Sequence, residues 1–315
     1  MTPQTTFPLV GTPYNPGPAG MDGYMSPDRS TPAAAGAKVG ITVLGTTRNE
    51  IEAFRRCWSV WSRQKVPKWL RPEFLVLDDG SDDGIRDEVV ALRKAKARIR
   101  WASFRAPGNK TERSCSLLWN AAIRQLVKTP LVMIGFWDRV PGGFRHLALL
   151  VEPHRTMAGI ATSPTSRHIG GSSSEVSMSP EQLGARLALV DWQEDPTRLE
   201  QVAGPLGGHC RAPNATESSG LVIPVAELVA VGGFDERYQS RAGYVNVTMY
   251  RRLLATGLVV WHPADPEANN YHLSHPCPVG RKKQDTFTLL RETAVVVNGG
   301  PGGEWGRIEP LEVIG

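Results

Sequence analysis

The sequence has no long apolar run, few cysteines and no basic, apolar leader. No stretch of its 315 residues approaches the roughly 20 consecutive apolar residues of a membrane helix. The four cysteines have no Cys-x-x-Cys spacing, so neither a zinc knuckle nor a disulfide framework is indicated. The polar Met1 to Leu9 lacks the regions of a signal peptide. We therefore expect a cytoplasmic protein with free thiols and no transmembrane segment.

Charge of either sign is also modest. The chain has 36 Lys and Arg against 31 Asp and Glu, a net charge of +5, which falls short of a nucleic-acid-binding footprint. This mild excess suits a phosphate-bearing ligand, and we expect no nucleic-acid partner. With 41% hydrophobic residues the chain can bury a full core, so a globular protein is expected.

The order of apolar runs predicts an α/β fold. Short continuous apolar runs, typical of buried parallel strands, alternate with segments of helical spacing. The predicted strands are 39–44, 74–77, 99–104 and 130–136, and the predicted helices between them are 49–61, 84–97 and 114–127. Asn49 is the predicted N-cap of the first helix. This β-α-β-α-β-α-β order is typical of right-handed crossovers in a mainly parallel sheet flanked by helices.

Composition sets the expected domain limits. Residues 1–37 are rich in Pro, Gly, Ser and Thr without apolar periodicity, so we expect a disordered tail. Residues 38–293 form the single predicted domain. Residues 294–315 are expected to be a C-terminal tail.

The segment from Asp78 to Gly84 follows the second predicted strand directly. In open α/β sheets ligands bind at the carboxyl ends of the strands, so these acids are expected to face a crevice. Gly80 and Gly84 permit a sharp bend, while Ser81 and the carboxylates offer acceptors for a base edge, a ribose hydroxyl or a metal ion. A solvated Asp- and Gly-rich turn is the alternative interpretation.

Four motifs in order give the chain a family resemblance. They are Thr46-Thr47-Arg48-Asn49, Asp78-Asp79-Gly80-Ser81, Leu118-Trp119-Asn120 and Val231-Gly232-Gly233-Phe234-Asp235-Glu236, and Tyr271-His272-x-x-His275 follows them. The stretch from Val39 to His275 resembles the GT-A glycosyltransferases, especially the large family-two group. The resemblance implies a GT-A fold and a nucleotide-sugar donor, with a nucleotide-binding half at 38–140 and a half for sugar and acceptor at 141–276.

The resemblance also implies which residues hold the donor. A uridine-based donor is expected, so the sugar nucleotide would be a UDP-sugar. Base, ribose and phosphates would be held by the following residues: Thr46, Arg48, Glu50, Asp78, Asp79, Arg113 and Trp137. A solvated helix end is the alternative place for Arg48 and Arg113.

A divalent metal is expected at the end of the fourth strand. The family's Asp-x-Asp aligns with Phe136-Trp137-Asp138, so the first acid is missing and Asp138 remains as the implied ligand. His272 and His275 are the candidates to complete the shell. Carboxylate oxygens with one imidazole suit Mn²⁺ or Mg²⁺. A helix or turn cap is the alternative role for Asp138.

The acceptor side departs most from the family. Where inverting members carry Glu-Asp, this chain has Val245-Asn246, and Asn cannot take up a proton. Three interpretations follow. Another acid, such as Asp235, Glu217 or Asp191, would act as the base, or the protein has lost the transfer activity. In the third, the reaction is retaining, as suggested by the match of Asn246 to the Glu-Asn of polypeptide N-acetylgalactosaminyltransferases. Asn246, Asp235 and Glu217 are therefore the candidate catalytic residues.

Together these features predict a metal-assisted hexosyl- or N-acetylhexosaminyltransferase. Its acceptor would be a protein, a glycan or a lipid. A noncatalytic nucleotide-sugar-binding or scaffold protein is the alternative.

Overall fold

The computed structural model describes the chain in separate stretches, and structural statements below refer to these. The described residues are 11–14, 37–108, 114–164, 166–168, 219–238, 245–263, 265–272 and 296–315. Within these stretches no helix combines the length and hydropathy needed to cross a bilayer.

The alternation predicted for the first half of the domain is confirmed. The elements are β2 (Val39–Thr47), α1 (Ile51–Trp61), β3 (Leu70–Asp78), α2 (Ile85–Lys94), β4 (Ile99–Ser103), α3 (Cys115–Ala121) with the π-helix Ala122–Leu126, and β5 (Leu131–Phe136). Strands β2, β3, β4 and β5 are mutually parallel neighbours. β3 begins earlier than its apolar core suggested, because Leu70 to Glu73 continue the pairing with β2.

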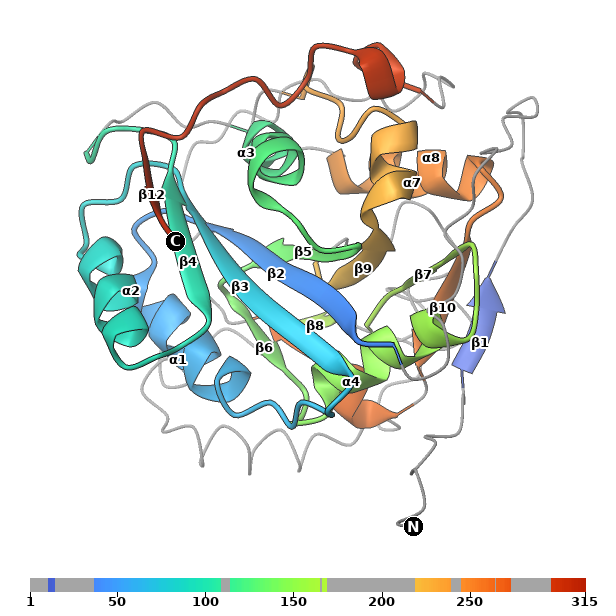
Figure 1. The fold of residues 1–315 in the computed structure, drawn as a ribbon, viewed down its shortest axis with the longest axis horizontal. Coiled ribbons are helices and arrows are strands. Elements are labelled where there is room, and N and C mark those ends of the chain that lie inside the picture. The colour runs from blue at the N-terminus through green and yellow to red at the C-terminus, as the bar shows by residue number, and fades with distance from the viewer. Residues whose placement is uncertain are drawn as a thin grey trace.

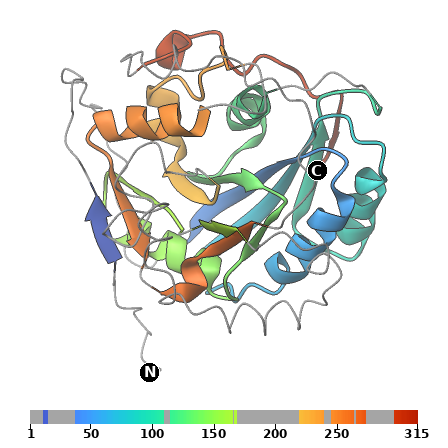
Figure 2. The same ribbon diagram turned by 180° about the vertical axis from the view of Figure 1, so that it is seen from behind.

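The rest of the described chain adds strands to this sheet and forms a second, smaller one. Its elements are β6 (Arg139–Pro141), α4 (His146–Val151), the 3-10 turn Glu152–Arg155, β7 (Ile160–Thr162), β8 (Ser166–His168), β9 (Leu221–Pro224), α7 (Val225–Ala230), α8 (Val245–Ala255), β10 (Val259–Pro263), the 3-10 turn Pro266–Ala268, β11 (Asn270–His272), the 3-10 turn Gly300–Gly302 and β12 (Glu312–Ile314). Among the described residues the large sheet has the order β1-β10-β7-β9-β5-β2-β3-β4-β12, in which β1 is Gly11–Tyr14. A smaller sheet, β6-β11-β8, comes to the front in the view from behind (Figure 2).

Helices cover both faces of the large sheet (Figure 1). Because side chains alternate along a strand, Leu75 and Leu77 pack with α3, α7 and α8, whereas Phe74 and Val76 pack with α1, α2 and α4. The result is two apolar cores on either side of one sheet. The structure is therefore an α/β fold of the predicted class, with the carboxyl ends of β2, β3 and β4 at one common edge.

Both ends of the chain add strands to the sheet. Gly11–Tyr14 (β1), within the expected disordered tail, pairs antiparallel with β10. Glu312–Ile314 (β12), within the expected C-terminal tail, pairs antiparallel with β4. Neither segment has apolar periodicity, since pairing at a sheet edge uses backbone groups that side-chain patterns do not reveal. Residues 1–10, 15–36 and 294–295 lie outside the described stretches.

Candidate active site

The turn after β3 is held in one shape by its own side chains. The Oδ1 atom of Asp78 accepts hydrogen bonds from the backbone N–H of Ser81 at 2.9 Å and from its hydroxyl at 2.6 Å. Burial raises the pKa of Asp78, and the two bonds from Ser81 oppose that rise. Gly80 has φ +85°, and a Cβ there would lie 2.7 Å from the carbonyl oxygen of Ala106, so only glycine fits.

This turn is bonded to the loop after β2. The hydroxyl of Ser81 accepts from the backbone N–H of Asn49 at 2.9 Å, and the Asn49 side chain accepts from the N–H of Asp82 at 2.9 Å. The prediction that Asn49 caps α1 is wrong: Glu50 occupies the N-cap position, and Asp83 accepts from the N–H of Ile51 at 2.7 Å. A carboxylate from a neighbouring loop replaces the local cap, while Asn49, at φ 51°, joins the two loops.

Asp79 lies between two arginines from different loops. Its Oδ2 atom is 3.5 Å from Nη1 of Arg48, and its Oδ1 atom is 3.2 Å from Nε of Arg105. The side chains of Asp79, Arg48 and Arg105 are 2%, 12% and 9% exposed, so solvent screens these pairs weakly. The carboxylate of Asp79 is therefore held between two guanidinium groups. Sequence reasoning missed Arg105, although its place just after β4 sets it at the same edge.

Three of the predicted donor residues lie in different surroundings. Thr46 is buried at the end of β2, and its carbonyl accepts from the backbone N–H of Trp137 at 3.4 Å. Glu50 is half-buried at the start of α1. The Trp137 ring is 2% exposed and packs edge-on to Phe54 at 5.4 Å, so it lies in the α1 core and not among the carboxylates.

Asp138 and the backbone of His272 come close through the smaller sheet. Asp138 directly precedes β6, and in the β6–β11 pair His272 is opposite Arg139. The Asp138 side chain is 8% exposed, and its Oδ1 atom is 3.5 Å from Nε of Arg139. That nitrogen also donates to the hydroxyl of Ser219 at 3.1 Å. A carboxylate oxygen is a ligand that a hard divalent cation takes, but the Asp138 carboxylate is paired with Arg139, and the described residues contain no cluster of three ligating side chains.

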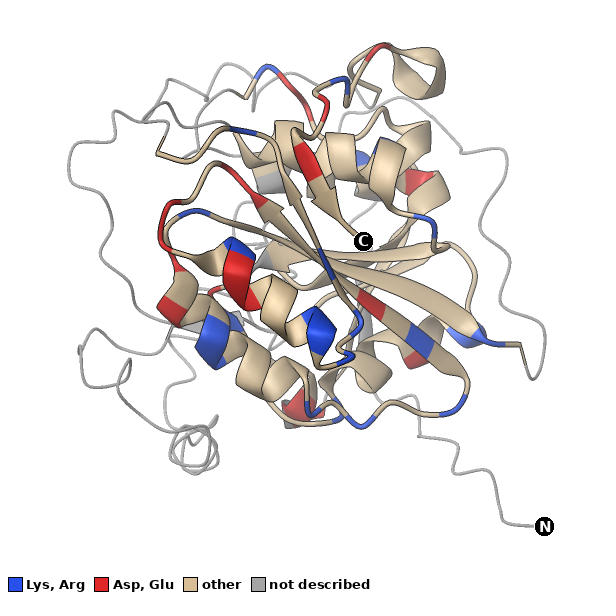
Figure 3. Ribbon diagram, turned by 60° about the vertical axis from the view of Figure 1, so that its left-hand side comes forward, with Lys and Arg blue, Asp and Glu red and all other residues tan. Residues whose placement is uncertain are grey.

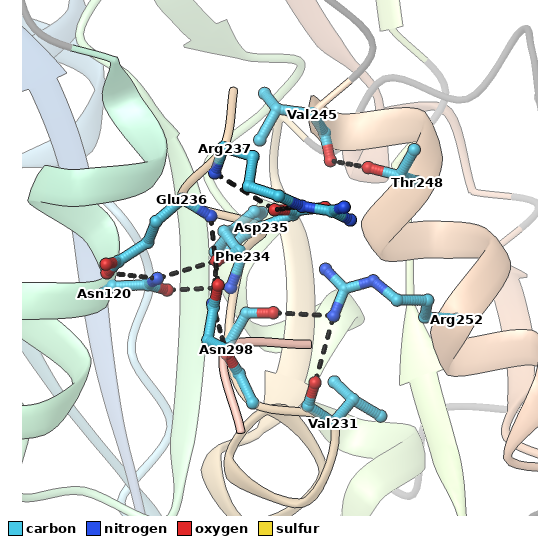
Figure 4. Close-up of polar contacts among 12 residues, drawn as sticks. Asn120, Val231, Phe234, Asp235, Glu236, Arg237, Val245, Thr248, Arg252 and Asn298 are labelled. Atoms are coloured by element: carbon cyan, nitrogen blue, oxygen red, sulfur yellow. Dashed lines mark hydrogen bonds and ion pairs between the residues drawn. The ribbon is translucent and has the colours of Figure 1, made fainter. Parts of the chain in front are cut away.

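The Gly-Gly-Phe-Asp-Glu loop is held by side chains from α3, from α8 and from the turn at Asn298 (Figure 4). Asn120 of α3 accepts from the N–H of Phe234 at 2.8 Å and donates to its carbonyl at 2.8 Å. Asn298 donates to the carbonyls of Gly232 and Phe234 at 2.8 and 2.6 Å. Arg252 of α8 donates to the carbonyls of Val231 and Gly233 at 3.1 and 2.9 Å. The carbonyls of residues 231–234 therefore all accept from a side chain.

Asp235, a candidate base, is engaged by its neighbour. Nε of Arg237 is 3.0 Å from Oδ1 of Asp235, Nη2 is 2.7 Å from Oδ2, and the backbone N–H of Arg237 donates to Oδ1 at 3.0 Å. Burial lowers the pKa of the nearby Arg252 to about 10, and the charge of Asp235 opposes that fall. The Asp235 carboxylate is therefore held in an ion pair with Arg237.

The remaining predicted residues are described partly or not at all. Asn246, in the first turn of α8, and His272, in β11, are described by their backbone alone. The others lie outside the described residues: Arg113, Asp191, Glu217 and His275.

Comparison with known proteins shows the fold. A structure of GalNAc-T7 with UDP, GalNAc and Mn²⁺ matches with a TM-score of 0.52 and 14% identity, covering 80% of this chain and 47% of that one. The fold is that of the GT-A glycosyltransferases. TarS of S. aureus matches with a TM-score of 0.48 and 15% identity, covering 75% of this chain and 60% of that one. A mannosyltransferase of Pyrobaculum calidifontis matches with a TM-score of 0.49 and 15% identity, covering 79% and 60%.

These matches leave much of the neighbours uncovered. The chain spans about 60% or less of the length of these three solved chains. No protein-family model matches the sequence, and no curated protein does.

Proposed function

We propose that this protein transfers a sugar from a nucleoside diphosphate sugar, with a UDP-sugar as the expected donor, to an acceptor hydroxyl. The observation that carries the proposal is the polar edge at the ends of β2, β3 and β4, where the Ser81-bound Asp78 lies beside Asp79, Arg48 and Arg105. The GT-A fold makes this edge the expected donor site. The presence of UDP, GalNAc and Mn²⁺ in the GalNAc-T7 structure supports a uridine donor and an N-acetylhexosamine among the candidate sugars.

Each side chain at this edge has a role that its contacts allow. Asp78 is fixed by Ser81, so its carboxylate is oriented to accept from a base or from ribose hydroxyls. Arg48 and Arg105 place two guanidinium groups at this edge, and these would stabilise a diphosphate leaving group. Thr46 would complete the base site from β2. A divalent cation, held by Asp138 and His272 with His275 as a further candidate, would offset the same phosphate charge.

The contacts of Asp235 argue against this residue as the catalytic base. They favour either a retaining reaction or another acid as the base. Both oxygens of Asp235 accept hydrogen bonds from Arg237, so this carboxylate is already engaged in an ion pair. Asn246 would then position the sugar or the acceptor, and Glu217 stays a candidate base. The engagement of Asp235 also supports the second candidate function, a nucleotide-sugar-binding protein without transfer.

The test is a panel of nucleotide sugars incubated with the protein and Mn²⁺, in which release of nucleoside diphosphate and donor binding are followed in parallel. We expect one donor to be hydrolysed slowly in a metal-dependent manner. Asp138→Ala should weaken Mn²⁺-dependent donor binding by at least about tenfold, a loss of about 1.4 kcal/mol. Asp87→Ala, which removes a carboxylate that is 84% exposed on α2, is the matched control.

The outcomes separate the two functions. Binding without hydrolysis, even with candidate acceptors present, would favour the binding protein. Absence of binding to every donor would contradict both. Turnover that is lost in Asn246→Ala but kept in Asp235→Asn would assign the positioning role to Asn246.

A further inference from the structure

The opposite edge of the sheet gathers positive charge. The amino ends of the parallel strands lie side by side, because Val39 pairs with Leu70, Phe74 with Ile99, and Ile41 with Leu131. Four stretches meet there: residues 37–38, 62–69, 94–98 and 127–130. Exposed basic side chains in these stretches are Lys38, Arg63, Lys65, Lys68, Lys94, Lys96, Arg98 and Lys128. We call this set the basic edge.

The basic edge holds no acid of its own. None of its four stretches contains Asp or Glu, whereas the turn from Asp78 to Asp83 at the other end of β3 contains four acids. Its eight positive charges exceed the net charge of +5 for the whole chain. Figure 3 shows blue segments on turns at this end of the strands. The described molecule therefore has a charge asymmetry along its strands.

Apolar and aromatic side chains accompany these charges. Val66, between Lys65 and Lys68, is 42% exposed, one of three large hydrophobic residues so exposed in the described stretches. Trp69 is half-buried, and the guanidinium of Arg155 lies 4.5 Å from its ring centroid. Exposed lysines around a protruding aliphatic side chain and an interfacial tryptophan are the combination that favours a bilayer surface.

We propose that the basic edge docks on a bilayer containing anionic phospholipids. Each Lys or Arg near such a surface is attracted to it, and Val66 would enter the boundary between headgroups and acyl chains. A single-stranded nucleic acid would instead need exposed ring faces for stacking, and Arg155 covers a face of Trp69. This proposal goes beyond sugar transfer and does not depend on it.

The docking geometry has a consequence for the other edge. β3 has 9 residues. At about 3.3 Å per residue, a strand of that length holds the turn after it about 30 Å from the bilayer. The polar edge with Asp78 and Arg48 would then face the aqueous phase. A chain-like acceptor that extends from the membrane could reach it.

The test is co-sedimentation of the full chain with vesicles of phosphatidylcholine alone and of phosphatidylcholine with phosphatidylglycerol in equal parts. We expect partitioning into the anionic vesicles only, weakened by added salt. Lys65→Gln with Lys68→Gln should reduce it by about tenfold or more. The matched control is Arg55→Gln with Arg86→Gln, which removes the same charge from exposed positions in the first halves of α1 and α2.

Three results would overturn the proposal. They are equal losses in the two double variants, no binding to anionic vesicles by the unaltered chain, and tighter binding to an oligonucleotide than to the vesicles at the same salt concentration. Retention by the control and loss by the Lys65 and Lys68 variant would support it. Circular dichroism of both variants verifies that they remain folded, and Val66→Ser supplies an independent variant whose effect should persist at high salt.

Discussion

The most direct perturbation of the glycine-rich loop is Asn120→Ala. The Asn120 side chain is fully buried and makes three hydrogen bonds, accepting from the N–H of Phe234 and donating to the carbonyl of Phe234 and to Oε1 of Glu236, each at 2.8 Å. The carbonyl of Phe234 keeps its bond from Asn298, but its N–H loses the acceptor. A buried N–H without a partner costs about 1–3 kcal/mol and a lost ordinary bond about 1 kcal/mol. We therefore expect a loss of about 2–4 kcal/mol in the free energy of unfolding.

Urea unfolding followed by tryptophan fluorescence measures this loss as a lower midpoint at unchanged slope. Gln125→Ala is the matched control. Gln125 is also an amide side chain on this helical segment, and it donates to the carbonyls of Gly306 and Ile308 at 2.7 and 3.1 Å. It is half-buried, so water replaces its lost bonds and we expect about 1 kcal/mol. An Asn120→Ala effect no larger than that of the control would refute the argument that the loop depends on Asn120.

Two further predictions concern the backbone and pH. Gly232→Ala should destabilise the fold by about 2 kcal/mol or more, because φ is +79° and the new Cβ would collide with the carbonyl oxygen of Val297. Gly302→Ala is the control and should be nearly neutral, because a Cβ there would have no atom within 4 Å. Equal losses of stability in the two variants, measured by thermal melts, would contradict this prediction. Burial lowers the pKa of His146 to about 4, so between the ordinary His value near 6.5 and pH 4 the unfolded chain binds the proton more readily and stability falls as pH falls. His146→Phe should reduce that slope by up to about 1.4 kcal/mol per pH unit in urea titrations, and an unchanged slope would exclude His146 as its source.

The sheet could be predicted because its signal is local. The runs at 39–44 and 130–136 are mostly apolar because β2 and β5 are buried on both faces, and segments of helical spacing separate the first four strands of the domain. The acids from Asp78 onward follow a strand directly, so their place at the carboxyl edge also followed from the pattern. The hydrogen bonds of this turn could not be predicted from the pattern, because they join residues far apart in the sequence: Asn49 and Ser81 are separated by 32 positions.

The segment after residue 296 could not be predicted for a different physical reason. It is attached by polar bonds and by one aromatic anchor, not by a periodic apolar face. The ring of Trp305 is 1% exposed, and its indole N–H donates to the carbonyl of Gly300 at 2.8 Å. Asn298 donates to two loop carbonyls more than 60 residues away in the sequence. Such contacts leave no periodic pattern in the sequence. The Gly-rich composition therefore suggested a free tail, whereas in the structure this segment packs against the loop at residues 231–236.

Two of the motifs that carried the family resemblance form one packing unit. Asn120, from Leu118-Trp119-Asn120, bonds to Phe234 and Glu236, from the Gly-Gly-Phe-Asp-Glu loop. A Cβ on Gly233, at φ +69°, would lie 2.5 Å from Oδ1 of Asn120, so this glycine is needed for the side chain to approach. These residue types are therefore explained by the loop's conformation alone, without reference to a reaction. Their presence argues for the fold, whereas any argument for catalysis must come from Asp78, Arg48, Asp138 and the first turn of α8.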